Sequence, residues 1–319
     1  MLNILTITAP IYLAIGTGYV ATRSGFFSKP DMHVLGRFVL NFALPAMLFN
    51  ALSQRDFEDV LHPSYLLAYS VGSLLAYAIG FAIWRYVRRQ DLTLSALVAM
   101  GVSCSNSGYV GYPILLQILG PVAGVGMALT VLIENLVIIP LGLAMADSGE
   151  SELASWQHTV LESFKRLLKI PMLWGIVGGF VFSMMGWQLP AFIFKAVNLF
   201  AVACAGIALF VNGGSLVGMQ VKGQMQAVGW IAASKLVLHP LLVGGMLWWV
   251  GPMDATLQIS GVLLASMPMM GIFPLLAQRH GHESFCAAAL LVTTVASFFT
   301  ISALLWGMSQ VPGWHLGAG

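Results

Sequence analysis

Two segments of the chain place helix-breaking residues and polar side chains inside long apolar stretches. Residues 103–113 read Ser-Cys-Ser-Asn-Ser-Gly-Tyr-Val-Gly-Tyr-Pro, and residues 266–274 read Ser-Met-Pro-Met-Met-Gly-Ile-Phe-Pro. Proline lacks an N–H and clashes with the preceding turn, and glycine lowers helix stability, so we expect a helix to be interrupted in each segment. The N-terminus of a half-helix presents free N–H groups and the positive end of the helix dipole. The two segments therefore predict a binding site for an anion.

The candidate binding residues come from both segments and from three amides elsewhere in the chain. They are Asn106, Ser107, Gly108, Tyr109 and Pro113 in the first segment, Ser266, Met267, Pro268, Gly271 and Pro274 in the second, and Asn41, Asn50 and Asn212 outside them. Proline and glycine also kink packed membrane helices that bind nothing. Matched interruptions in both halves of the chain favour a site near the membrane midplane over such kinks.

Two ionisable side chains lie deep inside apolar stretches. Glu134 is followed by Asn135 near the middle of residues 121–146, and Lys235 lies well inside residues 224–250. An intramembrane charge is costly, which makes each residue a functional candidate. We expect them to approach each other or to share a cation site, because pairing lowers the cost of desolvation. Three roles of Glu134 stay open: proton carrier, ligand of Na⁺, or static partner of Lys235.

The amino-acid composition indicates whether these residues lie in a soluble protein or in a membrane protein. Of 319 residues, 58% are hydrophobic and 8% are charged, and the mean hydropathy is +0.86. A soluble domain usually carries about 25% charged residues, so the sequence predicts an integral membrane protein. A net charge of +2 without a basic tract gives nucleic-acid binding no support. Cys104, Cys204 and Cys286 lie in apolar segments and are expected to pack, not to bind a metal, and no cofactor is expected.

Ten stretches are long and apolar enough to cross a membrane as helices of roughly 20 residues. They cover residues 4–22, 32–52, 65–86, 94–119, 121–146, 171–187, 190–217, 224–250, 256–278 and 284–308. The first lacks the basic region of a cleaved signal peptide, so we expect it to be retained. The sequence therefore predicts an all-α membrane protein with ten transmembrane helices.

Basic residues predict the orientation. Eleven of the fourteen Lys and Arg residues fall in connections that alternate on one side of the ten predicted helices. The positive-inside rule places these connections in the cytoplasm and both termini outside. The longest connection, 147–169, has apolar residues at helical spacing and is expected to lie as an amphipathic helix on the inner membrane surface.

The two halves of the chain, 1–146 and 170–319, are related by a weak repeat. Three residues in or just after the first stretch recur 161 positions later in the sixth: Pro10, Gly18 and Gly25 correspond to Pro171, Gly179 and Gly186. Pro113 and Pro274 share the same offset. Because each half holds five predicted spans, the second half enters the membrane from the opposite side. Inverted repeats of this kind are typical of secondary transporters.

Two motifs resemble the auxin efflux carrier family of membrane transporters. They are Asn106-Ser107-Gly108-Tyr109-Val110-Gly111-Tyr112-Pro113 and Asn41-Phe42-Ala43-Leu44-Pro45-Ala46-Met47-Leu48-Phe49. The resemblance implies the fold of bile-acid sodium symporters, with spans 1, 2, 6 and 7 as a scaffold. Spans 3–5 and 8–10 would form a transport domain in which spans 4 and 9 cross at their breaks. It also implies a homodimer formed through the scaffold.

The resemblance also implies a substrate class. Bacterial members are associated with malonate, malate and similar organic anions, and plant members move auxin, which is itself a carboxylate. The linker of about twenty residues resembles the compact bacterial type, which implies the bacterial inner membrane. The termini that the basic residues place outside would then be periplasmic.

Two other classes of protein are weighed against a transporter. An ion channel is the first, because Tyr109-Val110-Gly111-Tyr112-Pro113 is similar to the Thr-Val-Gly-Tyr-Gly filter of potassium channels, although that filter needs a four-fold axis. An intramembrane enzyme is the second, but the sequence holds no complete nucleophile motif, zinc-protease motif or Walker A motif. The sequence therefore predicts a secondary transporter that moves a small organic anion by alternating access, with coupling to H⁺ or Na⁺ left open.

Overall fold

The computed structural model describes residues 2–56, 60–148, 168–220 and 225–311. Within these ranges all regular elements are helical. The α-helices of the first half are α1 (Leu2–Arg23), α2 (Lys29–Phe38), α3 (Leu44–Ser53), α4 (Pro63–Ala82), α5 (Leu92–Ser103), α6 (Tyr112–Leu119), α7 (Ala123–Ile133) and α8 (Ile139–Ser148). Those of the second half are α10 (Pro171–Met185), α11 (Ala191–Ser215), α12 (Met225–Ala233), α13 (His239–Trp249), α14 (Ala255–Ala265), α15 (Phe273–Gln278) and α16 (Glu283–Met308).

The prediction of an all-helical membrane protein is confirmed for the described residues. Six continuous helical runs are long and apolar enough to cross a membrane: Lys29–Ser53, Pro63–Val87, Ala123–Ser148, Ala191–Ser215, Met225–Trp249 and Glu283–Met308. All ten predicted stretches contain helices, and ten crossings in an inverted repeat stay a prediction. The amphipathic helix predicted for the 147–169 connection falls almost wholly on residues outside the described ranges.

Four π-helical turns each end two residues before a proline. They are Val39–Ala43 before Pro45, Ser107–Gly111 before Pro113, Glu134–Ile138 before Pro140, and Ser234–Leu238 before Pro240. A proline ring clashes with the carbonyl four residues earlier and cannot donate to it, so the preceding turn widens. Glu134 begins one of these turns and Lys235 lies second in another. The prolines therefore shift the helical register where both charged side chains leave the helix.

One group of helices packs through glycine. α1 lies against α11, and α3 lies against α10, with α11 also touching α2 and α3. A Cβ atom at Gly18 would overlap the carbonyl of Phe210, and one at Gly213 would overlap that of Ile15. Small residues of this kind allow membrane helices to approach closely. The group thus unites the predicted spans 1, 2, 6 and 7.

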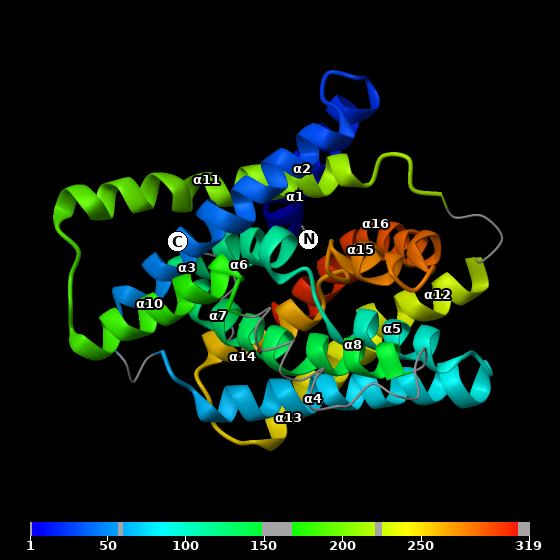
Figure 1. The fold of residues 1–319 in the computed structure, drawn as a ribbon. Helices are drawn as coiled ribbons and strands as arrows, with labels where there is room; N and C mark the ends of the chain where they lie inside the picture. Colours follow the sequence, from blue (N-terminus) through cyan, green and yellow to red (C-terminus); the bar gives the residue numbers. More distant parts are fainter. Residues whose placement is uncertain (1, 57–59, 149–167, 221–224, 312–319) are drawn as a thin grey trace.

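A second group surrounds the interrupted helices. α4 packs against α5 and α13, α13 packs against α14, and α14 packs against α7. Figure 1 shows α2 and α11 along one side of the molecule and α4 and α13 along the opposite side. The helix α5 is buried from Ser95 to Ser103. Residues 104–106 and 266–270 of the interrupted segments are buried and therefore lie in the interior, between the two outer pairs.

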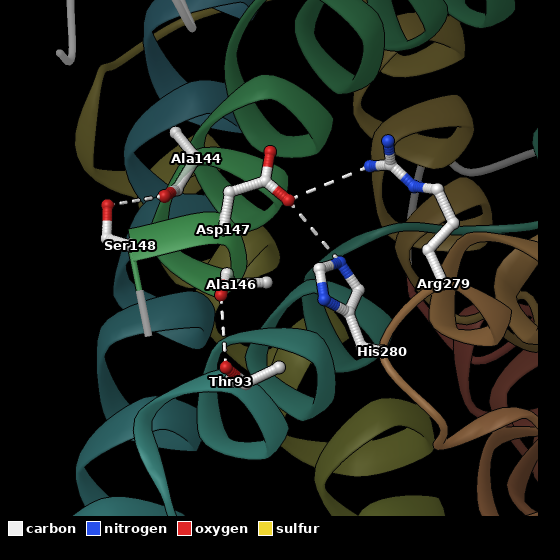
Figure 2. Close-up of polar contacts among 7 residues, drawn as sticks. All are labelled: Thr93, Ala144, Ala146, Asp147, Ser148, Arg279 and His280. Carbon is white, nitrogen blue, oxygen red and sulfur yellow. Dashed lines mark hydrogen bonds and ion pairs between the residues drawn. The ribbon is translucent and has the colours of Figure 1, made fainter. Parts of the chain in front are cut away.

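Polar contacts join the ends of α8 and α15 (Figure 2). The Asp147 carboxylate oxygen Oδ1 lies 3.7 Å from an Arg279 guanidinium nitrogen and 3.5 Å from His280 Nε2. The Thr93 hydroxyl donates to the carbonyl of Ala146 at 3.0 Å, which fastens the start of α5 to the same place. These contacts join the end of α8 to the end of α15 and to the start of α5.

Candidate functional site

Both sequence segments contain a helix break, and the two breaks touch. The first break is residues 104–106, between the end of α5 and the π turn that starts at Ser107. The second break is residues 266–272, between α14 and α15. The backbone N–H of Asn106 donates to the carbonyl of Pro268 at 2.7 Å. A backbone group released by one interruption is thus hydrogen-bonded by the other. Irregular backbone can be buried inside a membrane protein when its polar groups are paired in this way.

Two asparagine side chains meet at the first break. Asn106 Nδ2 donates to Asn212 Oδ1 of α11 at 3.0 Å, and both side chains are 3% exposed. Asn212 Nδ2 is buried and has no hydrogen-bond partner. A Cβ atom built at Gly271 would lie 3.8 Å from Asn106 Nδ2, so the second break borders the same spot. A buried amide donor without an acceptor costs about 1–3 kcal/mol, and an anion would remove that cost.

The helix that follows the first break adds backbone donors. The N–H groups of Val110 and Gly111 both bond to the Asn106 carbonyl. The N–H groups of the three preceding residues, from Ser107 to Tyr109, come before the first intrahelical donor, so the helix offers them no acceptor. This helix runs through the π turn and α6 to Leu119. Its N-terminus and the Asn212 amide together make a place that favours negative charge.

Glu134 binds donors at this same N-terminus. Its Oε1 accepts from the Ser105 backbone N–H at 2.7 Å, and its Oε2 accepts from the Ser107 hydroxyl at 3.0 Å. One carboxylate oxygen therefore binds a donor of the first break, and the other binds the first residue of the helix that follows it. A negative charge near a helix N-terminus is stabilised by the dipole.

Lys235 reaches both breaks. Its ammonium donates to Ser105 Oγ at 2.7 Å and to the Ala265 carbonyl at 3.0 Å, and it lies 2.7 Å from His239 Nδ1. Ammonium has three protons, so three acceptors use all of them, and the side chain is 0% exposed. Ala265 is the last residue of α14, whose C-terminal carbonyls carry the negative end of the dipole.

The expected approach of Glu134 and Lys235 takes an indirect form. The ion pairs found among the described residues involve Asp147, and a direct Glu134–Lys235 pair is absent from that part of the chain. Ser105 connects the two charges instead, because its N–H donates to Glu134 and its hydroxyl accepts from Lys235. A group of three metal-ligating side chains is likewise not found within the described ranges.

Several predicted residues line the breaks without polar contact to Asn106 or Asn212. Pro113 and Pro274 are buried in the first turns of α6 and α15. Gly108 faces Leu44, where a Cβ atom would lie 3.1 Å from a methyl carbon, and Met267 faces Gly111. The hydroxyl of Ser266 donates back to the Val262 carbonyl at 2.6 Å.

Four predicted residues make their hydrogen bonds elsewhere. Tyr109 donates from its hydroxyl to the Gly36 carbonyl of α2 at 3.1 Å, and Asn41 donates to the Arg37 carbonyl at 2.7 Å. Asn50 donates to Asn198 Oδ1 at 3.2 Å, and Asn135 donates to the Val131 carbonyl at 2.9 Å. The structure thus brings together Asn106, Asn212, Glu134 and Lys235, and leaves these four outside that cluster.

Ser105 and His239 join the cluster although the sequence alone did not single them out as site residues. Ser105 stands among three similar serines, and nothing in the residue order distinguishes it. His239 lies four residues after Lys235, and that spacing puts both on one helix face. The sequence favours a packed histidine bonded to a carbonyl at this position, and the structure places its ring nitrogens 2.7 Å from Lys235 Nζ and 3.0 Å from the Ser73 hydroxyl.

The segment similar to a potassium filter is helical. Residues 107–111 form a π turn, and the Tyr112 N–H donates to the Ser107 carbonyl. A filter needs carbonyl oxygens that face an ion, whereas carbonyls in a helical turn accept hydrogen bonds from the backbone N–H groups of the same helix. The geometry of this segment does not favour a channel.

The helical fold and its apolar spans define an integral membrane protein with a buried polar cluster at two helix breaks. The chain belongs to the family of membrane transport proteins (Mem_trans), whose model matches residues 3–306. The resemblance to the auxin efflux carriers is thereby confirmed.

The curated relatives cover nearly the whole chain. A protein of Rhizobium meliloti (strain 1021) named "Putative malonate transporter" is 27% identical over 308 residues, which cover 96% of each chain. The "Uncharacterized transporter YfdV" of Escherichia coli (strain K12) is 25% identical over 303 residues, or 93% of this chain and 94% of that protein. An "Uncharacterized transporter" of Methanothermobacter thermautotrophicus is 22% identical over 296 residues, 91% of this chain and 93% of that protein. These names describe transporters and not enzymes.

Proposed function

We propose that the protein is a secondary transporter of a small organic carboxylate, which binds where the two helix breaks meet. The observation that carries the proposal is the buried Asn212 amide, whose Nδ2 lacks an acceptor beside the N-terminus of the interrupted helix. A carboxylate supplies two oxygens, one for this amide and one for the helix N–H groups. A malonate-like or malate-like anion fits the name of the Rhizobium relative, and an auxin-like carboxylate uses the same donors.

Glu134 and Lys235 serve in this proposal as fixed charges. Glu134 stabilises the N-terminus of the helix after the first break, and Lys235 stabilises the C-terminus of α14 before the second. The Lys235 ammonium supplies the positive charge at the breaks that a bound Na⁺ would otherwise supply. Transport is then independent of Na⁺, and a proton remains the coupling ion to be tested at Glu134.

Alternating access would move the second group of helices against the first. α1, α2, α3, α10 and α11 act as the scaffold, and Asn212 of α11 contacts the moving breaks from the scaffold side. The Tyr109 hydroxyl adds a single hydrogen bond to α2 across the same boundary. Few polar contacts across the boundary favour relative movement. The proposal includes a homodimer in a bacterial inner membrane, with ten spans and periplasmic termini.

The substrate test uses purified protein in proteoliposomes and a panel of radiolabelled mono- and dicarboxylates. A hydrogen bond to a charged group contributes about 1.5–3 kcal/mol, so Asn212→Ala is expected to raise KM by roughly 10- to 150-fold. Asn198→Ala is the matched control, because Asn198 lies exposed on the same helix and bonds Asn50, which the structure leaves outside the cluster at the breaks. Failure of the wild type to move any carboxylate overturns the proposal, and a wild-type KM in Asn212→Ala overturns the site.

The coupling test imposes Na⁺ and pH gradients separately on the same proteoliposomes. Uptake that is unchanged when choline replaces Na⁺ supports the role of Lys235. A pH-gradient dependence that Glu134→Gln abolishes identifies Glu134 as the proton carrier, and an unchanged dependence leaves it a static charge.

A further inference from the structure

The imidazole of His239 is held at both nitrogens. His239 Nδ1 lies 2.7 Å from Lys235 Nζ, and His239 Nε2 lies 3.0 Å from the Ser73 hydroxyl of α4. Both His239 and Ser73 are 0% exposed. The ring of Tyr69, one turn before Ser73, packs edge-on against the imidazole at a centroid distance of 6.0 Å. The ring therefore has a fixed position and a fixed rotation.

The partners of the ring decide where its proton lies. An ammonium group can only donate, so His239 Nδ1 must be an unprotonated acceptor. A neutral imidazole then carries its proton on Nε2 and donates it to Ser73 Oγ. A hydroxyl accepts such a bond readily. The hydrogen bonds thus run in one direction, from Lys235 at the helix breaks through His239 to Ser73.

The other two acceptors of Lys235 belong to the breaks themselves. Ser105 Oγ lies in the first break, and the Ala265 carbonyl ends the helix before the second. His239 is the acceptor that comes from the same helical run as Lys235, one turn further on. Without it, one proton of a fully buried ammonium would lack a partner, which is costly. The side chain would then turn away from one of the breaks.

We propose that His239 is a positioning residue for transport: as the Nε2–H tautomer, anchored by Ser73, it holds the Lys235 ammonium so that it joins both helix breaks. The proposal rests on the proposed function, since the breaks are where the carboxylate binds. Loss of the Nδ1 acceptor loosens the geometry of the breaks and weakens substrate binding.

Two amide variants separate this role from simple filling of space. The amide of an asparagine lies near the position of a histidine Nδ1, so His239→Asn keeps an acceptor for Lys235. The amide of a glutamine lies near the position of Nε2, so His239→Gln keeps the contact with Ser73 and loses the one with Lys235. We expect a KM within about threefold of wild type for His239→Asn and at least tenfold higher for His239→Gln, as 1.4 kcal/mol of lost binding corresponds to a factor of ten. Glutamine is closer to histidine in size, so a space-filling role predicts the opposite order, and that order overturns the proposal.

A second measurement does not depend on the substrate. Nitrogen NMR of the ¹⁵N-histidine-labelled protein in lipid bilayers reports the tautomer of each ring. The chain has seven histidines, and the signals lost in His239→Asn belong to His239. A protonated Nε2 with an unprotonated Nδ1 supports the proposal, and a protonated Nδ1 overturns it. If the tautomer is as expected but no carboxylate is transported, the proposed function fails and the placement of His239 stands.

Discussion

The indirect coupling of Glu134 and Lys235 predicts a measurable non-additivity in stability. Glu134→Gln preserves both hydrogen bonds of the carboxylate, because a glutamine accepts from the Ser105 N–H and donates to the Ser107 hydroxyl. It removes only the charge. Lys235→Met removes the donor of three bonds, to Ser105, His239 and Ala265. Each single variant leaves one buried charge without a counter-charge.

The magnitude follows from these contacts. Removing one partner of a buried charge pair costs about 3–5 kcal/mol, and we expect each single variant to fall in that range. Two charges about 4 Å apart interact by about 4 kcal/mol at an effective dielectric constant of 20. Ser105 separates these two, so their interaction is smaller, and we expect a coupling energy of about 2 kcal/mol. The double variant should therefore be more stable than the sum of the single changes predicts.

The assay is SDS-induced unfolding in mixed micelles, followed by the fluorescence of the nine tryptophans. Glu283→Gln is the matched control, because Glu283 lies exposed at the start of α16, where its loss should cost no more than about 1 kcal/mol. Single-variant effects that add within about 0.5 kcal/mol would refute the coupling. Such a result would mean that Ser105 insulates the two charges from each other.

Two further predictions test the packing. Gly213→Ala should destabilise the protein by about 1–3 kcal/mol, because the added Cβ overlaps the Ile15 carbonyl. Gly206→Ala lies on the same helix, where an added Cβ meets nothing within 4 Å, and it should be neutral or stabilise the protein by up to about 1 kcal/mol. Equal effects of the two substitutions in the SDS assay would contradict the close α1–α11 crossing. Asp147→Asn removes the ionic contacts with Arg279 and His280, and because the carboxylate is partly exposed it should cost about 0–1 kcal/mol. A loss above about 2 kcal/mol, or one that 0.5 M salt does not reduce, would show that more than an exposed ion pair was lost.

The interruptions of α5/α6 and α14/α15 were predictable because proline and glycine act within one turn of themselves. The same local reasoning placed Glu134 and Lys235 inside long apolar stretches. It did not distinguish Asn212 from Asn41 and Asn50, since all three are asparagines in apolar stretches. Which face each helix turns toward the breaks depends on packing: Asn212 bonds Asn106, whereas Asn41 bonds a carbonyl of its own helix.

The sequence by itself determined that the chain is helical and membrane-embedded, and where its helices are interrupted, because burial of apolar residues and the chemistry of proline are local. The tertiary structure alone decided which side chains meet. Three helical runs bring Lys235, Glu134 and Ser105 together, and the π turns before Pro140 and Pro240 set the angle at which both charges leave their helices. These contacts span up to 130 residues. They arise from helix crossings such as that of α5 and α8, where a Cβ atom at Gly142 would overlap Met100, and no residue in isolation specifies a crossing.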